Sequence, residues 1–145
     1  MLTHTAEELQ ARYRKAIGGR PGNGLSGLQI EECTPERIVA RAEFEESHAR
    51  PGGMVAGPVL FTLADAVAYF VTISRSPKGS EAFTASISME FLRPAPVGAL
   101  TAEGRLLRFG KRSSVVDTII RSAGIEEPVA HAVVTYAPVF PERAH

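Results

Sequence analysis

Residues 51–74 read PGGMVAGPVLFTLADAVAYFVTIS, and this stretch decides the fold. From Pro58 onward its apolar residues recur at intervals of three and four, which is typical of a helix. Proline suits the first position of a helix, and Gly57 before it suits the cap. Apolar side chains would surround most of this helix, so we expect it to be buried at the centre of the domain. The apolar positions are Val59, Leu60, Leu63, Ala66, Val67, Phe70 and Val71.

Asp65 is the only formal charge in this stretch. A polar stripe follows the same helix at spacings of three and four, formed by Thr62, Asp65, Tyr69 and Thr72. A buried carboxylate needs a partner, a raised pKa or an adjoining cleft. Two explanations stay open. Either the stripe lines a ligand cleft, or Asp65 is a structural group held by backbone donors or by an arginine at a subunit contact.

Composition narrows the class of protein. With 145 residues, 44% hydrophobic content and no break in composition, the chain is predicted to form one domain over residues 1–145. Sixteen basic and sixteen acidic residues cancel, which argues against nucleic acid and anionic membranes as partners. The single cysteine, Cys33, allows no internal disulfide and suggests no metal site. The N-terminus is polar, so we expect a soluble, cytoplasmic protein.

The remaining segments predict an antiparallel sheet. Thr5 and Glu8 form a capping box, which predicts a leading helix and loop over residues 1–19. Apolar and polar residues alternate in residues 37–45 and 83–91, as in strands, and residues 25–32, 100–108, 113–121 and 129–139 complete the set of predicted strands. In 83–91 the alternation sets Phe83, Ala85, Ile87, Met89 and Phe91 on one face. This order of elements implies an α+β fold with the long helix packed on one face of the sheet.

Three segments together resemble the hot-dog-fold acyl-CoA thioesterases related to the phenylacetate-degradation thioesterase. They are RPGGMVAGPVLFTLADAVAYF at 50–70, SISMEFLRPAPVGALTAEGRLLRFGKRSSVVDTII at 86–120 and VAHAVVTYAPV at 129–139. The most specific parts are the Gly-x-x-x-x-x-Leu-Ala-Asp run from Gly57 to Asp65, and FLRPAPVG at 91–98 followed by a strand and RFGKR at 108–112. The resemblance implies a curved antiparallel sheet wrapped around a long central helix. It also implies a homodimer with active sites at its interface, and often a homotetramer built as a dimer of dimers.

The resemblance assigns chemistry to two residues of the central helix. Asp65 would attack the thioester carbonyl or activate a water molecule. Gly57 would donate its backbone N–H to the tetrahedral oxyanion, because a helix N-terminus presents unpaired amides. The structural alternative for Gly57 is a helix cap without a catalytic part.

Arg50 departs from the family pattern. It stands seven residues before Gly57, where the family tends to have Asn or Gln, and Ala56 and Pro58 replace the His and second Gly of a His-Gly-Gly motif. An arginine at this position would either pair with Asp65 and lower its pKa, or bind an acyl or carboxylate group.

A basic turn is the other expected binding element. It contains Arg108, Lys111, Arg112 and Ser113 around Phe109-Gly110. In the family the equivalent turn lies near the phosphates of coenzyme A, although a solvated basic hairpin explains the same residues. Together with Arg50, Thr62 and Tyr69 these residues form the expected substrate-binding set.

The expected function is hydrolysis of a small or medium acyl- or aryl-CoA thioester to the free acid and coenzyme A. No cofactor is expected, since coenzyme A is part of the substrate. Two alternatives stay open: a non-catalytic acyl-CoA binding protein, and a hot-dog dehydratase that uses His48 with Asp65.

Overall fold

The computed structural model of the protein describes residues 1–17, 25 and 27–141. Residues 18 and 19 of the predicted leading helix and loop lie outside the described residues. The elements, in chain order, are α1 (Ala6–Ile17), β1 (Gln29–Cys33), β2 (Arg37–Phe44), the 3-10 turn η1 (Glu46–His48), β3 (Ala49–Arg50), β4 (Met54–Val55), α2 (Gly57–Ser74), β5 (Glu81–Phe91), β6 (Gly98–Phe109), β7 (Ser114–Ser122) and β8 (Ala130–Val139).

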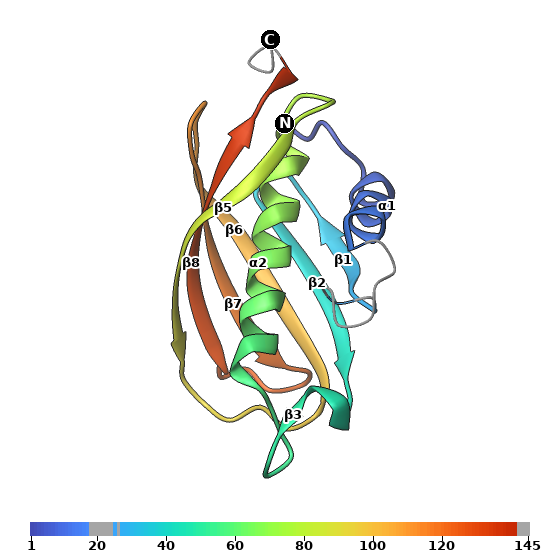
Figure 1. Cartoon of the computed structure of the whole chain (residues 1–145), viewed down its shortest axis with the longest axis vertical. Helices are drawn as coiled ribbons and strands as arrows, with labels where there is room; N and C mark the ends of the chain where they lie inside the picture. Colours follow the sequence, from blue (N-terminus) through green and yellow to red (C-terminus); the bar gives the residue numbers. More distant parts are fainter. Residues whose placement is uncertain (18–24, 26, 142–145) are drawn as a thin grey trace.

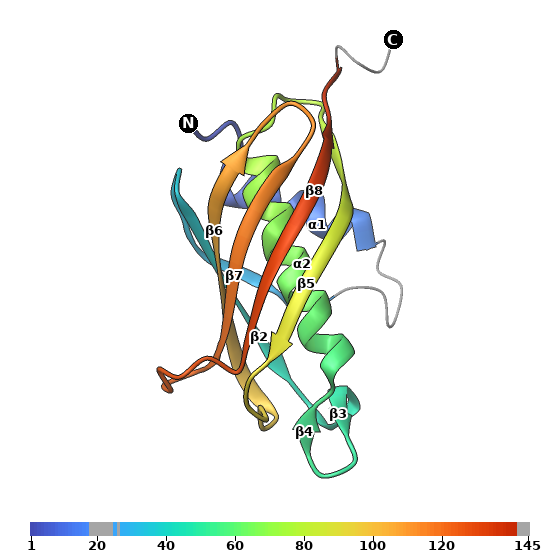
Figure 2. The same cartoon turned by 90° about the vertical axis from the view of Figure 1, so that its left-hand side faces the viewer.

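The main sheet has six strands in the order β1-β2-β6-β7-β8-β5, and every neighbouring pair is antiparallel. The sheet curves around α2, which runs along its concave face (Figure 1). Figure 2 shows β6, β7, β8 and β5 side by side in front of this helix, with β5 at the edge. The predicted α+β hot-dog architecture is confirmed.

Helix α2 forms the centre of the core, as its periodicity predicts. Most of its 18 residues are buried against β2, β5, β6, β7 and β8. Helix and sheet approach closely at Gly104 of β6, where an added Cβ would lie 2.6 Å from Cγ1 of Val67. By length and hydropathy α2 is the one described helix that could also cross a membrane, but here the sheet encloses it. Its cap is Ala56, one residue earlier than predicted.

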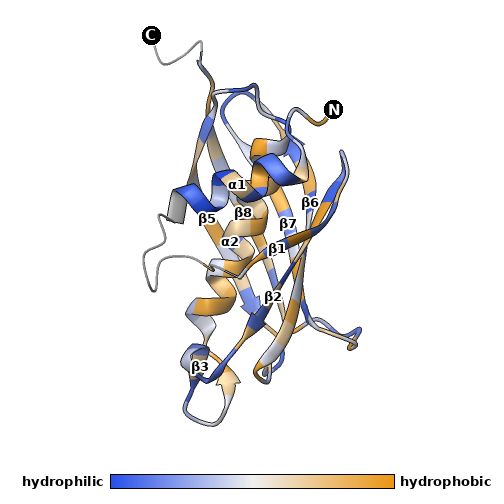
Figure 3. Cartoon of the chain, turned by 90° about the vertical axis from the view of Figure 1, so that its right-hand side faces the viewer, coloured by the Kyte–Doolittle hydropathy of each residue, from blue (hydrophilic) through white to orange (hydrophobic). Residues whose placement is uncertain are grey.

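Helix α1 begins at the predicted capping box. The backbone N–H of Thr5 donates to Glu8 Oε1 at 2.9 Å, and the N–H of Glu8 donates to Thr5 Oγ1 at 3.1 Å. Leu9 and Tyr13 on its inner side are buried in the core. Its other side carries hydrophilic residues, blue in Figure 3, whereas α2 is mostly pale to orange.

Strand β5 contains a β-bulge that the sequence pattern did not reveal. The pairing with β8 shifts between Thr84 and Ser86, so Ala85 is the extra residue. Phe83 is therefore opposite Ala137, on the outer face, and is 63% exposed. The prediction that Phe83 shares a face with Met89 is wrong, because one inserted residue reverses the alternation.

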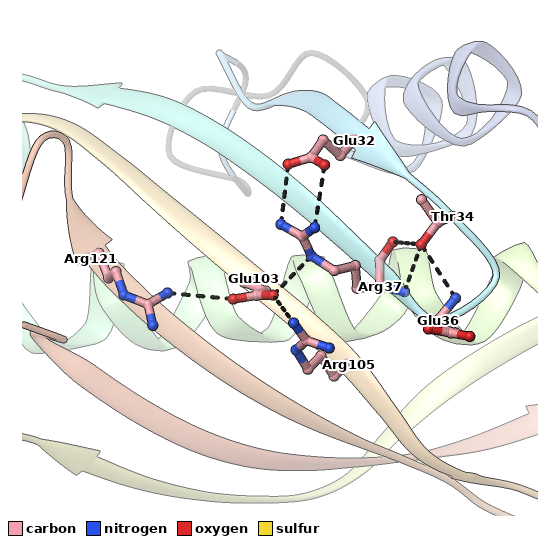
Figure 4. A network of polar contacts seen from close by, with 7 residues as sticks. All are labelled: Glu32, Thr34, Glu36, Arg37, Glu103, Arg105 and Arg121. Carbon is pink, nitrogen blue, oxygen red and sulfur yellow. Dashed lines mark hydrogen bonds and ion pairs between the residues drawn. The ribbon is translucent and has the colours of Figure 1, made fainter. Parts of the chain in front are cut away.

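The face of the sheet turned away from α2 carries a charged network centred on Glu103 (Figure 4). The Glu103 carboxylate lies 2.9 Å from Arg105 and 3.4 Å from Arg121. Arg37 Nε is 2.8 Å from the same carboxylate, an ion pair by distance although its N–H is not aimed at the oxygen. Arg37 also pairs with Glu32 at 3.1 Å. The network links strands β1, β2, β6 and β7 across the sheet.

Candidate active site

Asp65 lies half-buried in the third turn of α2, with its carboxylate turned toward β5 and β8. Its Oδ1 accepts hydrogen bonds from the hydroxyl of Thr84 at 2.8 Å and from the hydroxyl of Tyr136 at 2.7 Å. The Tyr136 hydroxyl also lies 3.1 Å from the backbone carbonyl oxygen of Asp65. No hydrogen bond from the described residues reaches Oδ2. The carboxylate is thus fixed through one oxygen, and its second oxygen can act on a ligand.

The register of the sheet brings these two hydroxyls together. Thr84 and Tyr136 are direct partners across β5 and β8, and the bulge at Ala85 puts Thr84 on the face toward α2. Tyr136 is only 4% exposed. Burial, reinforced by the charge of Asp65, raises the pKa of the Tyr136 phenol above its ordinary value. The phenol therefore stays protonated at neutral pH and remains a donor to the carboxylate.

The backbone donors expected for a purely structural carboxylate are not found at Asp65. Within the described part of the chain, its side chain bonds neither a backbone N–H nor an arginine. Arg50 in particular forms no ion pair with Asp65 in one chain. Two neutral hydroxyls hold the carboxylate instead, and they leave its negative charge uncompensated.

Gly57 presents a free amide at the start of α2. The carbonyl oxygen of Ala56 accepts bonds from the N–H groups of Val59, at 3.0 Å, and Leu60, at 3.3 Å. The Gly57 N–H has no such partner among the described residues. A Cβ added at Gly57 would lie 3.6 Å from the ring of Phe91, so this ring packs over the helix start. A backbone N–H that is unbonded at the start of a helix has the features of an oxyanion donor.

Gly57 and Asp65 do not meet in one chain. Eight residues of α-helix separate them, which is ~12 Å along the helix axis at 1.5 Å per residue. A thioester carbonyl can contact only groups within about 3 Å of its own atoms. One copy of the chain therefore carries both chemical groups but does not bring them to the same reacting carbon.

Arg50 lies in the β3–β4 hairpin, beside the start of α2. It lines a groove of about 410 Å³ together with Gly57, Phe91 and Arg93. A second groove of about 540 Å³ begins at the same Gly57 and Phe91 and extends to Phe61 and Thr62. Asp65 lines neither groove.

The predicted polar stripe on α2 does not face a single cleft. Thr62 bonds the carbonyl oxygen of Pro58 at 3.0 Å and lines the groove beside Phe61. The Tyr69 hydroxyl accepts a hydrogen bond from Arg12 Nε of α1 at 2.7 Å, and it lies 3.4 Å from Glu81. Thr72 is fully buried and bonds Ser114 at 2.9 Å. The four polar side chains of the stripe, including Asp65, therefore contact different neighbours.

The basic turn lies at the opposite end of the domain from Gly57. The Gly110 N–H donates to the carbonyl oxygen of Ser113 at 2.8 Å, which closes the turn around Lys111 and Arg112, and Arg108 lies near the end of β6 just before it. The adjoining Ser114 contacts Thr72 near the end of α2. Fifteen helical residues separate Thr72 from Gly57, about 22 Å along the axis. Within one chain, Arg108, Lys111, Arg112 and Ser113 are thus remote from Arg50 and Gly57.

The histidines have other partners. His48 Nδ1 accepts the backbone N–H of Glu45 at 3.0 Å and forms no hydrogen bond to Asp65. His131 Nε2 lies 2.6 Å from Asp117 Oδ1 on the outer face of the sheet. The described residues contain no group of His, Cys, Asp and Glu side chains that could hold a metal ion.

Sequence reasoning missed Thr84 and Tyr136 as the partners of Asp65. Tyr136 had a readable signal: it is the one polar group that alternates with Ala132 and Val134 on the buried face of β8. Thr84 had none, since strict alternation would turn it away from the helix.

Comparison with known proteins identifies the family of the chain. The model of the family described as the thioesterase superfamily matches residues 52–129. A protein of Saccharolobus solfataricus named as an esterase is 30% identical over 91 residues, which are 63% of this chain and 60% of that protein. The chain thus spans less than two thirds of this curated relative's length.

Solved structures extend the likeness to nearly the whole chain. A protein of Silicibacter sp. TM1040 named as a thioesterase superposes with a TM-score of 0.84, at 30% identity, over 96% of this chain and 94% of that one. A phenylacetic acid degradation-related protein of Ralstonia eutropha gives 0.71 at 23% identity, over 87% and 89% of the two chains. A thioesterase protein of Streptococcus pneumoniae, solved with coenzyme A, gives 0.76 at 23% identity, over 88% and 97%. The last two likenesses show the fold alone. On the family match and the first of these structures, the chain belongs to the thioesterase superfamily.

Proposed function

We propose that the protein is an acyl-CoA thioesterase that hydrolyses small or medium acyl- or aryl-CoA thioesters to the free acid and coenzyme A. The observation that carries this proposal is the carboxylate of Asp65, held through Oδ1 by Thr84 and Tyr136, while no described residue bonds its Oδ2. Membership of the thioesterase superfamily supports the reaction type. The Streptococcus pneumoniae neighbour was solved with coenzyme A, which supports coenzyme A as the leaving group of the proposed reaction.

In the proposed reaction, Oδ2 of Asp65 either takes a proton from the attacking water or itself attacks the thioester carbonyl carbon. The developing oxyanion accepts a hydrogen bond from the N–H of a Gly57. Collapse of the tetrahedral intermediate breaks the C–S bond, and coenzyme A leaves as the thiolate. In the second route, water then hydrolyses the mixed anhydride that forms on Asp65.

We further propose that each site uses two copies of the chain. The ~12 Å between Gly57 and Asp65 rules out a common substrate carbonyl within one copy. Strand β5 has 11 residues, its outer edge is unpaired in one chain, and its side chains are largely exposed. Such an edge pairs readily with another strand. Antiparallel pairing of β5 with β5 of a second copy would make one continuous sheet and a homodimer.

The register of this pairing follows from what lies beside β5. Thr84 contacts Asp65, and Phe91 packs over Gly57. The pairing must therefore bring Thr84 opposite the partner's Phe91. Allowing for the extra residue at Ala85, this register sets Ser88 opposite the partner's Ser88.

The same pairing gives the basic turn a role. In an antiparallel pair, the turn of one copy comes to the end of the sheet where α2 of the other copy begins. Arg108, Lys111, Arg112 and Ser113 of the copy that supplies Asp65 would then lie on the side of the partner's Gly57. We propose that they contact the phosphates of coenzyme A.

The test is thiol release from a panel of short-chain, medium-chain and aryl acyl-CoA esters, by the wild-type protein and by Asp65→Asn. Loss of a general base or nucleophile is expected to lower kcat by about 10² or more. Asp117→Asn, on the outer face, is the matched control and should retain the wild-type rate. An unchanged rate in Asp65→Asn would overturn the mechanism. Binding without turnover by the wild type would favour an acyl-CoA carrier, and hydration of an enoyl-CoA would favour the dehydratase.

A further inference from the structure

The groove beside Arg50 is built by two segments that are far apart in the sequence. The N–H of Val55 in β4 donates to the carbonyl oxygen of Ala95 at 2.8 Å, and Met54 forms an isolated bridge with Pro96. These contacts fix the β3–β4 hairpin against the segment that follows β5. The groove between them has a volume of about 410 Å³. Its lining consists of Arg50, Met54, Val55, Gly57, Leu60, Phe91, Leu92, Arg93, Pro94 and Ala95.

Two arginines enter this groove, and the lining contains no acidic residue. Arg93 is oriented by a hydrogen bond from Nη1 to the carbonyl oxygen of Pro128 at 2.7 Å, which leaves the rest of its guanidinium available. The side chain of Arg50 makes neither a hydrogen bond nor an ion pair with the described residues. Its position is set by the tight hairpin, in which Gly52 and Gly53 adopt positive φ angles of 105° and 79°. Both cationic groups therefore lack a carboxylate partner.

The neighbouring grooves differ in charge. The groove of about 540 Å³ that shares Gly57 and Phe91 has no charged residue in its lining. A groove of about 710 Å³ on the other side of the helix start is lined by Glu43 and Glu45 and by neither Arg nor Lys. Gly57 lines the first two grooves and not the acidic one, so a ligand bound at the Gly57 N–H meets cations in one direction and apolar side chains in the other.

We infer that the groove of Arg50 and Arg93 binds an anionic oxygen group of the thioester substrate, a carboxylate or a phosphate, while its neighbour at Phe61 takes an uncharged part. Guanidinium groups bind both kinds of oxyanion through paired hydrogen bonds. This inference rests on the proposed thioesterase function. The anionic group has two sources: a carboxylate at the far end of the acyl group, or the phosphates of coenzyme A.

The experiment compares pentanoyl-CoA with glutaryl-CoA, whose acyl group ends in a carboxylate, and repeats both acyl groups as phosphate-free N-acetylcysteamine thioesters. If the groove takes the acyl carboxylate, Arg50→Gln lowers the ratio of kcat/KM for glutaryl over pentanoyl esters about tenfold with either thiol. If it takes a phosphate, the variant raises KM of both CoA esters by a similar factor and spares the N-acetylcysteamine esters. Arg14→Gln, an exposed arginine of α1, should keep the wild-type values.

Arg93→Gln should reproduce the effect of Arg50→Gln, and Arg93→Lys should restore part of it because the positive charge returns. Values for Arg50→Gln within twofold of wild type on all four esters would overturn the inference. Calorimetric titration of the two CoA esters into wild type and Arg50→Gln provides a readout that needs no turnover. A protein that hydrolyses nothing but loses affinity in Arg50→Gln would refute the proposed function and still support the groove.

Discussion

The hydroxyl of Tyr136 lies 2.7 Å from Oδ1 of Asp65, although 71 residues separate the two in the chain. Tyr136 is buried and Asp65 is half-buried, so this hydrogen bond joins a side chain of the core to a partly exposed carboxylate. A donor on Oδ1 fixes the rotation of the carboxylate and thereby directs Oδ2. Tyr136 and Thr84 are thus positioning residues in the proposed reaction.

Tyr136→Phe is expected to lower kcat about tenfold with little change in KM, because one charge-assisted hydrogen bond to Asp65 is lost. Thr84→Val should act in the same direction. The double variant should lose more than either single variant but less than Asp65→Asn, whose carboxylate is absent. Steady-state kinetics on one acyl-CoA ester checks this series. Full activity in the double variant would show that Asp65 needs no positioning.

Stability is expected to fall in alkaline solution. Burial raises the pKa of Tyr13, Tyr69 and Tyr136 above their ordinary values in the folded protein. In the unfolded chain these phenols ionise near pH 10, so above that pH the unfolded state binds fewer protons than the folded state. The stabilisation is thus complete below about pH 10 and is lost as the pH rises toward the folded pKa values.

Urea unfolding at pH 8 and at pH 10.5 measures this alkaline loss. Tyr136→Phe removes the most strongly shifted of the three phenols, so its unfolding free energy should decrease less between the two pH values than that of wild type. An equal decrease in both proteins would assign the alkaline sensitivity to other groups.

Ser88→Cys should form a disulfide between two copies of the chain. The proposed register sets residue 88 opposite its own counterpart, and directly paired strand residues have Cβ atoms about 5 Å apart. Cys33 is replaced by Ala in this experiment so that residue 88 carries the only thiol. Non-reducing electrophoresis after mild oxidation detects the dimer.

Ser86→Cys in the same background is the control. Its counterpart in the proposed pair lies several residues along the strand, beyond the reach of a disulfide. Efficient cross-linking through residue 86 with none through residue 88 would show that the register is different.

Glu103→Gln should destabilise the folded protein by about 1–3 kcal/mol, because it removes the charge that three guanidinium groups share. The Glu103 side chain is only 16% exposed, so water replaces the lost contacts poorly. Glu43→Gln breaks the exposed pair with Arg41 and should cost less than ~1 kcal/mol. Equal losses of unfolding free energy in the two variants would contradict this difference.

The sequence predicts the two helices and the positions of the strands along the chain because each depends on local signals. The capping box of Thr5 and Glu8 forms as expected, and the spacing of Leu60, Leu63 and Val67 identifies the buried helix. Such signals need only the neighbours in the chain.

The site is less predictable because its contacts are long-range. The pattern identified Asp65 as unusual, but its partners on β5 and β8 depend on strand register. Periodicity places Tyr69 and Thr72 on one stripe, whereas α1, β5 and β7 decide what each of the two side chains contacts. The distance between Gly57 and the basic turn likewise depends on how the strands are ordered.

The bulge in β5 makes the length of this strand as important as its composition. If Ala85 were paired in strict alternation, Thr84 could face Asp65 only if Ile87, Met89 and Phe91 turned to the solvent. Either half of the strand could then keep its place, but not both. The extra residue thus allows one strand to support the carboxylate with Thr84 and to pack Phe91 on the helix start, which no exchange of one side chain in a regular strand could do.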